Sequence, residues 1–199
     1  MAVVAEPVHA AREIQRPAIK IVPLQALPIV GLLLVGLIVA IATNSRWALD
    51  AYHVVGGGLW TALDLFLGLV LGPIMGTMSI PSRIEFSSRL MPKLLVIMPT
   101  VVTMSLGSGF QLARHLGNLA PTYVNHDWLV ASYAIVGVMA VIALGLLEPA
   151  NVAVLFELRR PKPNAARIQR LMKVFIYTAG VTGLMQIATL VIMTKLASG

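Results

Sequence analysis

The chain has 199 residues and a net charge of +7; 58% of its residues are hydrophobic, only 12% are charged, and its mean hydropathy is +0.86. Because soluble domains average about 25% charged residues, this composition excludes an ordinary soluble domain and predicts an integral membrane protein in a lipid bilayer. The absence of cysteine excludes disulfides, thiolate-bound iron–sulfur clusters, zinc ribbons and covalently attached c-type haem.

Five apolar stretches are each about as long as the ~20 residues that a helix needs to cross a bilayer. They cover residues 24–43, 51–78, 94–112, 128–155 and 174–193. The second and fourth stretches are longer than needed and contain Pro73 and Pro149 late in their runs. We expect each proline to kink its helix or to end its membrane portion. The sequence therefore predicts an all-α, polytopic bundle of five transmembrane helices, a single domain over residues 24–199.

Residues 1–23 form a polar leader before the first span, which we expect to lie as a short helix on the cytoplasmic leaflet. Ala40-Ile41-Ala42 is similar to a signal-peptide cleavage site. The leader is long for a signal peptide, however, and the apolar run is long enough to span. We therefore expect the first span to remain in the mature protein.

The basic residues are unevenly divided between the two ends of the spans. Twelve of the fifteen Lys and Arg residues lie before the first span, between the second and third, or between the fourth and fifth. Only Arg46, Arg114 and Lys195 lie on the opposite side. By the positive-inside rule, the N-terminus is predicted to be cytoplasmic and the C-terminus outside. The positive charge is thus a topology signal, typical of a multi-pass inner (cytoplasmic) membrane protein, and not a nucleic-acid-binding surface.

One face of the second span carries a column of unusual residues. His53, Gly57, Trp60 and Asp64 are separated by four, seven and eleven positions, so they fall within a narrow arc of a helix. A carboxylate at mid-membrane costs roughly 2.5–3.5 kcal/mol on insertion scales and usually marks a functional or paired site. We therefore expect this column to face away from lipid. Asp64 is the candidate catalytic residue, which would carry a proton or tune a redox potential.

Three of the four histidines fall at the predicted outer membrane face, namely His53, His115 and His126. Neutral imidazole is a common ligand for transition metals and haem iron. His115 and His126 are equally well explained as interfacial residues, whereas His53 lies in an apolar helix and is interpreted as a ligand. Gly57 would leave a gap for a flat ring below the imidazole. The neighbouring glycines at 56 and 58 fit plain helix packing equally well.

Other polar and small residues suggest how the spans would contact ligands or each other. In the third span, Gly107 thins the helix near the outer leaflet. Arg114 follows at the outer end, where it would pair with a haem propionate, with Asp50 or Asp127, or with lipid phosphate. Gly68, Gly72 and Gly76 form a small-residue ridge that suits tight helix contact, within the chain or in a homo-oligomer. In the fifth span, Thr182, Gln186 and Thr189 form a polar column that most simply faces the interior.

Short motifs in the second and third spans resemble those of a known superfamily. The chain reads His-Val-Val-Gly-Gly-Gly-Leu-Trp from His53, Arg-Leu-Met-Pro from Arg89, Ile-Met-Pro-Thr from Ile97, and Gly-Ser-Gly from Gly107. These motifs, within residues 51–116, resemble the bacterial copper-resistance D-type membrane proteins and the related J-type protoporphyrinogen oxidases. The resemblance implies a small helical bundle and, in the haem-synthesis branch, b-type haem ligated at the position of His53. The segment that begins at Asp64 resembles a separate subgroup, so the resemblance does not extend to oxidase activity.

Together these observations predict an integral membrane b-type cytochrome. It would bind one or more haem b groups near the outer face through His53 and act in electron transfer or redox chemistry. The second axial ligand would be His115 or His126, or would be absent, and the absence of one would favour gas binding or redox chemistry. Trp60 would pack on the ring.

Two functional alternatives remain open at this point. Arg46 and Arg114 would hold haem propionates under the first prediction, but the outer-face histidines would equally suit a copper transport or delivery protein. A non-catalytic subunit of a larger membrane complex is the other alternative, in which the polar columns bind other helices. A homo-oligomer or a subunit of a membrane complex is expected in each case. No motif identifies a redox partner or decides whether the protein is an enzyme.

Overall fold

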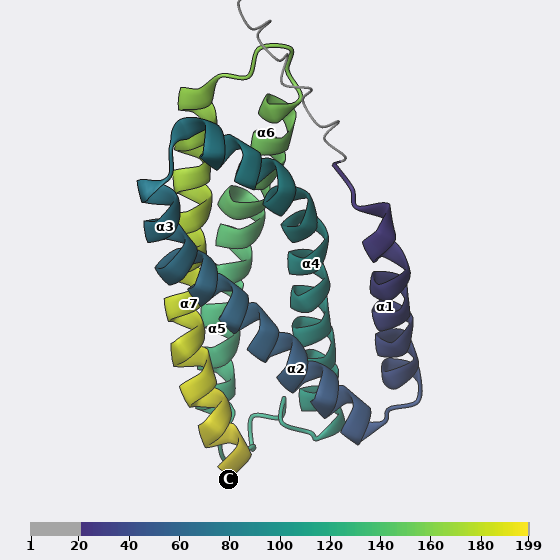
Figure 1. The fold of residues 1–199 in the computed structure, drawn as a ribbon. Coiled ribbons are helices and arrows are strands. Elements are labelled where there is room, and N and C mark those ends of the chain that lie inside the picture. Colours follow the sequence, from purple (N-terminus) through teal and green to yellow (C-terminus); the bar gives the residue numbers. More distant parts are fainter. Residues whose placement is uncertain (1–20, 199) are drawn as a thin grey trace, which may run out of the picture.

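A computed structural model describes residues 21–198 of the chain, and within that range the protein is built from helices, without a strand (Figure 1). A 3-10 turn, η1 (Leu24–Ala26), leads into α1 (Leu27–Ala42). The remaining elements, in chain order, are α2 (Arg46–Leu65), η2 (Phe66–Leu71), α3 (Gly72–Thr77), α4 (Ile80–His115), α5 (His126–Ile142), η3 (Ala143–Leu147), α6 (Glu148–Leu158) and α7 (Ala165–Ser198). Residues 1–20 of the predicted leader lie outside the described residues.

Five continuous helical rods in this range are long and apolar enough to cross a membrane. They are Leu24–Ala42, Arg46–Thr77, Ile80–His115, His126–Leu158 and Ala165–Ser198. The predicted all-α bundle with five membrane-spanning helices is therefore confirmed, and the chain has the form of a multi-pass membrane protein.

The third and fifth rods begin well before their apolar stretches. The α4 helix starts at Ile80, where Ser79 caps it by accepting the N–H of Ser82 at 3.4 Å and Pro81 occupies the first turn. The basic residues from 83 to 93 were expected between spans, but they lie on this helix. Hydropathy marks only where a helix is apolar, whereas its cap decides where it begins. The first turns of α4 run across the end of the bundle before the helix descends (Figure 1).

Each of the two predicted proline kinks follows a π-helical segment. Pro73 comes directly after η2 and Pro149 directly after η3, and helix continues beyond both. Proline lacks an N–H and its ring clashes with the carbonyl four residues earlier, so the preceding turn widens to relieve the clash. The prolines therefore distort the second and fourth rods without ending them.

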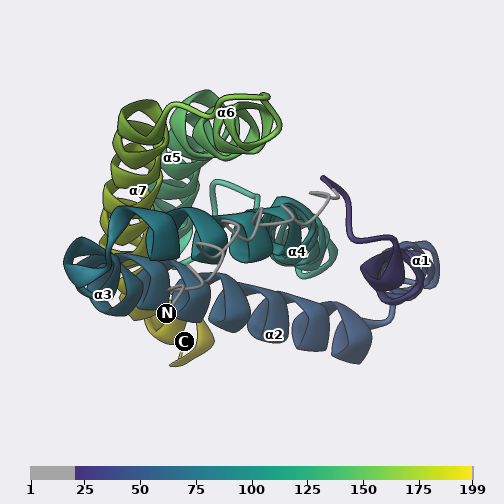
Figure 2. The ribbon, with the colours of Figure 1, turned by 45° about the horizontal axis from the view of Figure 1, so that its top comes forward.

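The rods pack as two layers joined by a crossing of α2 and η2 over α7. The α2 helix lies against α4, whereas α7 lies against α5 and α6. Figure 2 shows α1 at the edge of the bundle, beside the beginning of α2 and away from α5, α6 and α7. The buried core includes Met91, Leu155, Met172 and Phe175, each at most 2% exposed. This arrangement leaves one face of α2 against α4 and another against α7.

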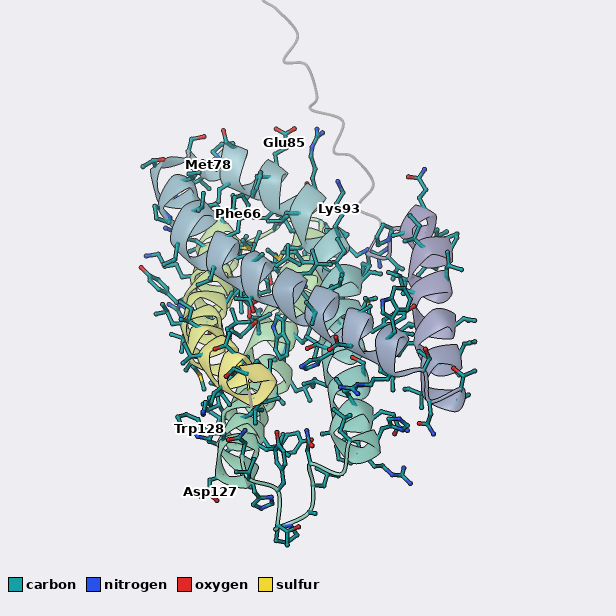
Figure 3. The ribbon with its side chains drawn as sticks, turned by 90° about the horizontal axis from the view of Figure 1, so that it is seen from below. Phe66, Met78, Glu85, Lys93, Asp127 and Trp128 are labelled. Atoms are coloured by element: carbon teal, nitrogen blue, oxygen red, sulfur yellow. The ribbon has the colours of Figure 1, made fainter. Side chains whose placement is uncertain are left out.

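The two ends of the bundle differ in charge. Figure 3 shows Met78, Glu85 and Lys93 at one end and Asp127 and Trp128 at the other. Nine of the twelve Lys and Arg residues within the described range belong to the first end, which we call the basic end. This charge distribution is the basis for predicting that the basic end is cytoplasmic. The orientation of the termini stays a prediction.

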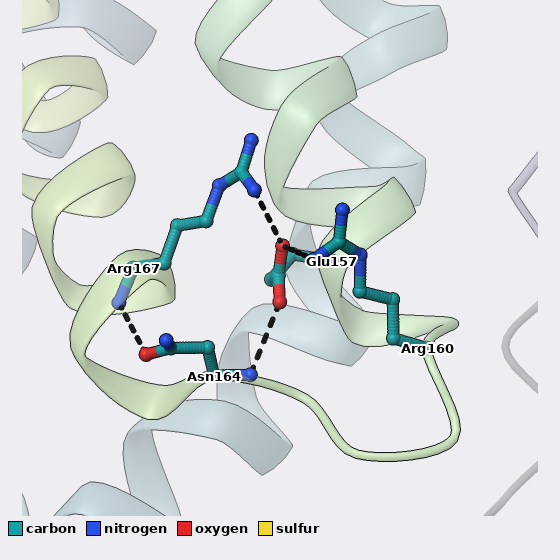
Figure 4. Close-up of polar contacts among 4 residues, drawn as sticks. All are labelled: Glu157, Arg160, Asn164 and Arg167. Carbon is teal, nitrogen blue, oxygen red and sulfur yellow. Dashed lines mark hydrogen bonds and ion pairs between the residues drawn. The ribbon is translucent and has the colours of Figure 1, made fainter.

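A buried carboxylate closes the loop between α6 and α7 at the basic end. Glu157 is only 2% exposed, accepts the N–H of Asn164 at 3.1 Å, and pairs with Arg160 and Arg167 at 3.4 Å each (Figure 4). The side chain of Asn164 in turn accepts the N–H of Arg167 at 3.1 Å and so caps the first turn of α7. These contacts fix where α7 begins.

Candidate functional site

A cluster of polar side chains lies between α2 and α7, where the interior is otherwise apolar. Asp64 is 0% exposed, and its Oδ2 atom accepts two hydrogen bonds of 2.9 Å, from Thr182 Oγ1 and from Gln186 Nε2. The Trp60 indole adds an electrostatic interaction with this carboxyl group. No described residue places a donor in hydrogen-bonding geometry at Oδ1. The carboxyl group is thus held through one oxygen while the other is buried without a hydrogen bond.

Thr61 extends this cluster on the α2 side. Its hydroxyl reaches both Gln186 Oε1 and the carbonyl of Gly57. Because the amide nitrogen of Gln186 donates to Asp64, its oxygen needs a donor, and Thr61 is placed to supply one. Thr61 and Asp64 from α2 therefore meet Thr182 and Gln186 from α7, with all four buried. We call these four residues the Asp64 cluster.

Three glycines, one on η2 and two on α7, set the close approach that this cluster requires. A Cβ atom added to Gly68 would lie only 2.3 Å from the Cα atom of Gly180, so the backbones of η2 and α7 touch at this crossing. Gly183, one residue after Thr182, abuts the backbone of Asp64 and Leu65. The small-residue ridge predicted from the sequence thus makes a contact within the chain at Gly68. That contact brings short polar side chains of the two helices within hydrogen-bonding distance.

His53 lies one layer away, between α2 and α4. Its Nδ1 atom is 2.9 Å from the carbonyl oxygen of Ser105. A carbonyl can only accept, so Nδ1 carries the hydrogen, and in the neutral imidazole Nε2 then carries the lone pair. A Cβ atom on Gly109 would lie 2.5 Å from the imidazole ring, so only glycine leaves room for the ring here. The ring is half-buried, and its Nε2 atom has no hydrogen-bond partner among the described residues.

The column predicted on α2 faces inward, but it meets two different helices. Gly57 lies against α4, where an added Cβ atom would be 3.2 Å from Ser105 Oγ. Trp60 and Asp64 are buried further along, and Asp64 faces α7. Helix packing thus accounts for Gly57 as well as for Gly56, while Gly58 faces open space. His53 and Asp64, eleven residues apart on one helix, are separated by roughly 16 Å along its axis.

The structure does not bring the three candidate histidine ligands together. His115 is exposed and lies six residues beyond Gly109 on α4, which places it about 9 Å further along the helix and on another face. His126 begins α5, which packs on α7, and its buried Nδ1 atom has no partner among the described residues. No group of three or more His, Asp or Glu side chains in residues 21–198 is arranged to hold a metal ion.

The remaining candidate residues lie at the surface or in helix contacts. Arg46 and Arg114 are exposed and form no ion pair with a described residue. Gly107 faces α1, where an added Cβ atom would make an ordinary contact with Leu37 at 3.5 Å. Both arginines are free to meet an anionic group at the end opposite the basic end.

No protein family, curated protein or solved structure matched the chain in our comparisons. The resemblance of its motifs to a haem-binding superfamily therefore stays a prediction. The features of the fold that bear on function are the two centres on α2, His53 and the Asp64 cluster.

Proposed function

We propose that the protein is a membrane b-type cytochrome that binds haem through Nε2 of His53. The observation that carries the proposal is the 2.9 Å contact between His53 Nδ1 and the carbonyl of Ser105. Histidines that ligate metals usually donate their other ring N–H to a carbonyl or carboxylate, which fixes the tautomer and the ring orientation. His53 has this arrangement, and its Nε2 atom makes no competing hydrogen bond.

Among the described residues, His53 is the histidine whose ring is fixed by a backbone partner and which would hold the haem. His115 is on another face of α4 and exposed, and no cluster of three ligating side chains exists in the described residues. If His53 alone held the haem, a small molecule would be able to bind to it, which favours redox or gas-binding chemistry over simple electron transfer. Haem would supply a one-electron redox couple, and the chain would supply the fixed imidazole.

Asp64 is the group through which this chain would take up a proton. An ionisable residue inside a membrane bundle is expensive to bury and is a functional-site hypothesis by default. Asp64 accepts two hydrogen bonds on Oδ2, has the Trp60 indole beside its carboxyl group, and forms no ion pair with a described residue, so a proton is the charge it would bind. In this proposal Asp64 compensates the charge of an arriving electron by binding a proton.

Visible absorption of the purified full-length protein tests the proposal, first oxidised and then reduced with dithionite. We expect a Soret band that is lost in His53→Ala and kept in His115→Ala, the matched histidine control. Carbon monoxide should shift the reduced spectrum if His53 is the one protein ligand of the haem. A Soret band of full intensity in a folded His53→Ala protein would refute the assignment.

A separate measurement tests the role of Asp64. Asp64→Asn keeps an oxygen that can accept from both Thr182 and Gln186 but removes the titratable group. We expect the haem midpoint potential to depend on pH in the wild type and to depend on it less in this variant. An unchanged pH dependence would remove Asp64 from the redox chemistry while leaving the haem assignment intact.

A second candidate function is suggested by the chemistry of the Asp64 cluster. The carboxyl group of Asp64, the hydroxyls of Thr61 and Thr182 and the amide of Gln186 lie in one buried place. The carboxyl group would suit a proton, and with the amide of Gln186 turned so that its oxygen faces Asp64 the cluster would suit a hard cation, without any cofactor. This candidate predicts a colourless protein whose thermal stability rises with sodium or lithium in the wild type but not in Asp64→Asn. A haem spectrum lost in His53→Ala would decide for the first candidate.

A further inference from the structure

A wedge-shaped cavity opens between α3 and α7 on the side of the basic end. The helices touch at Gly68, where an added Cβ atom would be 2.3 Å from Gly180. At Gly72 the corresponding distance to the Ile176 side chain is 2.8 Å, and at Gly76 no atom lies within 4 Å. The two helices therefore diverge along three successive glycine turns. The space between them is a cavity of about 300 Å³.

The lining of this cavity is mostly apolar and includes two basic side chains. Met75, Met172 and Ile176 are buried side chains that line it, and Arg83 and Lys173 line it as well. Neither cation forms an ion pair with an acidic residue in the described part of the chain. Two positive charges thus stand uncompensated beside an apolar space, on helices long and apolar enough to span a membrane.

Arg83 is held in place by the end of α3. Its Nη2 atom donates to the carbonyl oxygens of Gly76 at 3.3 Å and Met78 at 3.1 Å, which are acceptors left over at a helix C-terminus. Its Nε atom is buried, whereas its Nη1 atom is not, and Nη1 makes no hydrogen bond with a described residue. The guanidinium is therefore positioned by backbone contacts and retains Nη1 as a donor for another ligand. An anionic oxygen is the natural partner for that donor.

We propose that this cavity binds one anionic phospholipid, with its phosphate at Arg83 and Lys173 and an acyl chain along Met75, Met172 and Ile176. Charge complementarity selects the head group, because two uncompensated cations favour a net negative lipid over a zwitterionic one. Basic pockets between transmembrane helices on the cytoplasmic side bind such head groups. The apolar wedge selects a lipid over a soluble phosphate compound. The site is independent of His53 and of the proposed haem.

Native mass spectrometry of the delipidated full-length protein tests the site, with phosphatidylglycerol and phosphatidylcholine as separate probes. We expect one phosphatidylglycerol to be retained in preference to phosphatidylcholine. Lys173→Gln should weaken that binding about fivefold, the effect of one basic residue near an anionic membrane surface. Arg170→Gln is the matched control, because Arg170 is exposed on the same helix turn but does not line the cavity. The affinity of the Arg170→Gln protein for phosphatidylglycerol should stay unchanged.

A second variant tests the cavity without changing charge. Gly76→Leu should fill the open space of the cavity beside Gly76 and abolish phosphatidylglycerol binding. The thermal transition of this variant in detergent shows whether the bundle is still folded. Equal binding of the two lipids, or an equal loss in Arg170→Gln, would overturn the proposal in favour of a diffuse charge effect. Binding of inorganic phosphate that displaces the lipid and survives Gly76→Leu would overturn it in favour of a soluble anion.

Discussion

The contact between Gly68 and Gly180 makes a quantitative prediction for the stability of the bundle. Gly68→Ala places a Cβ atom 2.3 Å from the Cα atom of Gly180, whereas carbon atoms pack at about 3.5–4.0 Å. The helices must therefore separate by more than 1 Å. Overpacking of this kind costs about 1–3 kcal/mol, and a helix gains up to about 1 kcal/mol when alanine replaces glycine. We expect a net loss of about 1–2 kcal/mol, which is a 5–30-fold change in the unfolding equilibrium.

Titration with a denaturing detergent, followed by circular dichroism, measures this loss in purified protein. Two matched glycine variants serve as controls. Gly180→Ala should cost less, because its Cβ atom would lie 3.3 Å from Gly68, and Gly58→Ala meets open space and should be neutral or stabilising. If Gly68→Ala and Gly180→Ala are equally destabilising, or if Gly68→Ala resembles Gly58→Ala, the described geometry of the crossing is wrong.

Three further predictions concern individual side chains. Asn151 is fully buried, and both polar atoms of its side chain lack a partner. Replacing it by leucine, which has a similar shape, should therefore raise the free energy of unfolding by about 1–2 kcal/mol. A loss of stability in Asn151→Leu would show that the amide has a partner. Gly109→Ala should displace the proposed histidine ligand and lower Soret absorbance per protein, whereas Gly107→Ala should not, and equal spectra would contradict this. Glu157→Ala should speed tryptic cleavage of the loop over residues 159–164 because a buried charge-assisted contact worth about 1.5–3 kcal/mol is lost. Glu85→Ala is the control, because it removes an exposed ion pair worth only about 0.3–0.5 kcal/mol, and the loop should then be cleaved at the wild-type rate. Equal cleavage rates in Glu157→Ala and Glu85→Ala would contradict the prediction.

Hydropathy was sufficient to predict the number and approximate position of the helices, because a bilayer sets the length of an apolar run. Helical periodicity likewise predicted that Asp64, Thr182 and Gln186 face inward, and all three are buried. It could not pair them, since periodicity describes one helix at a time and says nothing about its neighbour. The pairing depends on the backbone contact at Gly68 and Gly180, which only a three-dimensional structure reveals.

Other parts of the site left no usable signal in the sequence. The partner of His53 is the backbone carbonyl of Ser105, and every residue has such a carbonyl. Thr61 completes the Asp64 cluster, yet a threonine in an apolar helix is common and its hydroxyl often bonds to its own backbone. Glu157 follows the fourth apolar run, where an acidic residue is most simply interpreted as lying at the membrane–water interface. In each case the partner is distant in sequence or has no distinctive side chain.

The placement of both centres on α2 limits how they can act together. At roughly 16 Å, a unit charge at Asp64 and one at His53 would interact by about 1 kcal/mol with an effective dielectric constant near 20. For a one-electron couple this corresponds to a shift of about 40 mV in midpoint potential. In the proposed cytochrome, Asp64 would therefore be too far away to exchange a proton directly with a group bound at His53, but close enough for reduction and protonation to favour each other. This electrostatic coupling between the two centres requires no motion of α2. That is consistent with a helix held by glycine contacts to α4 on one face and to α7 on another.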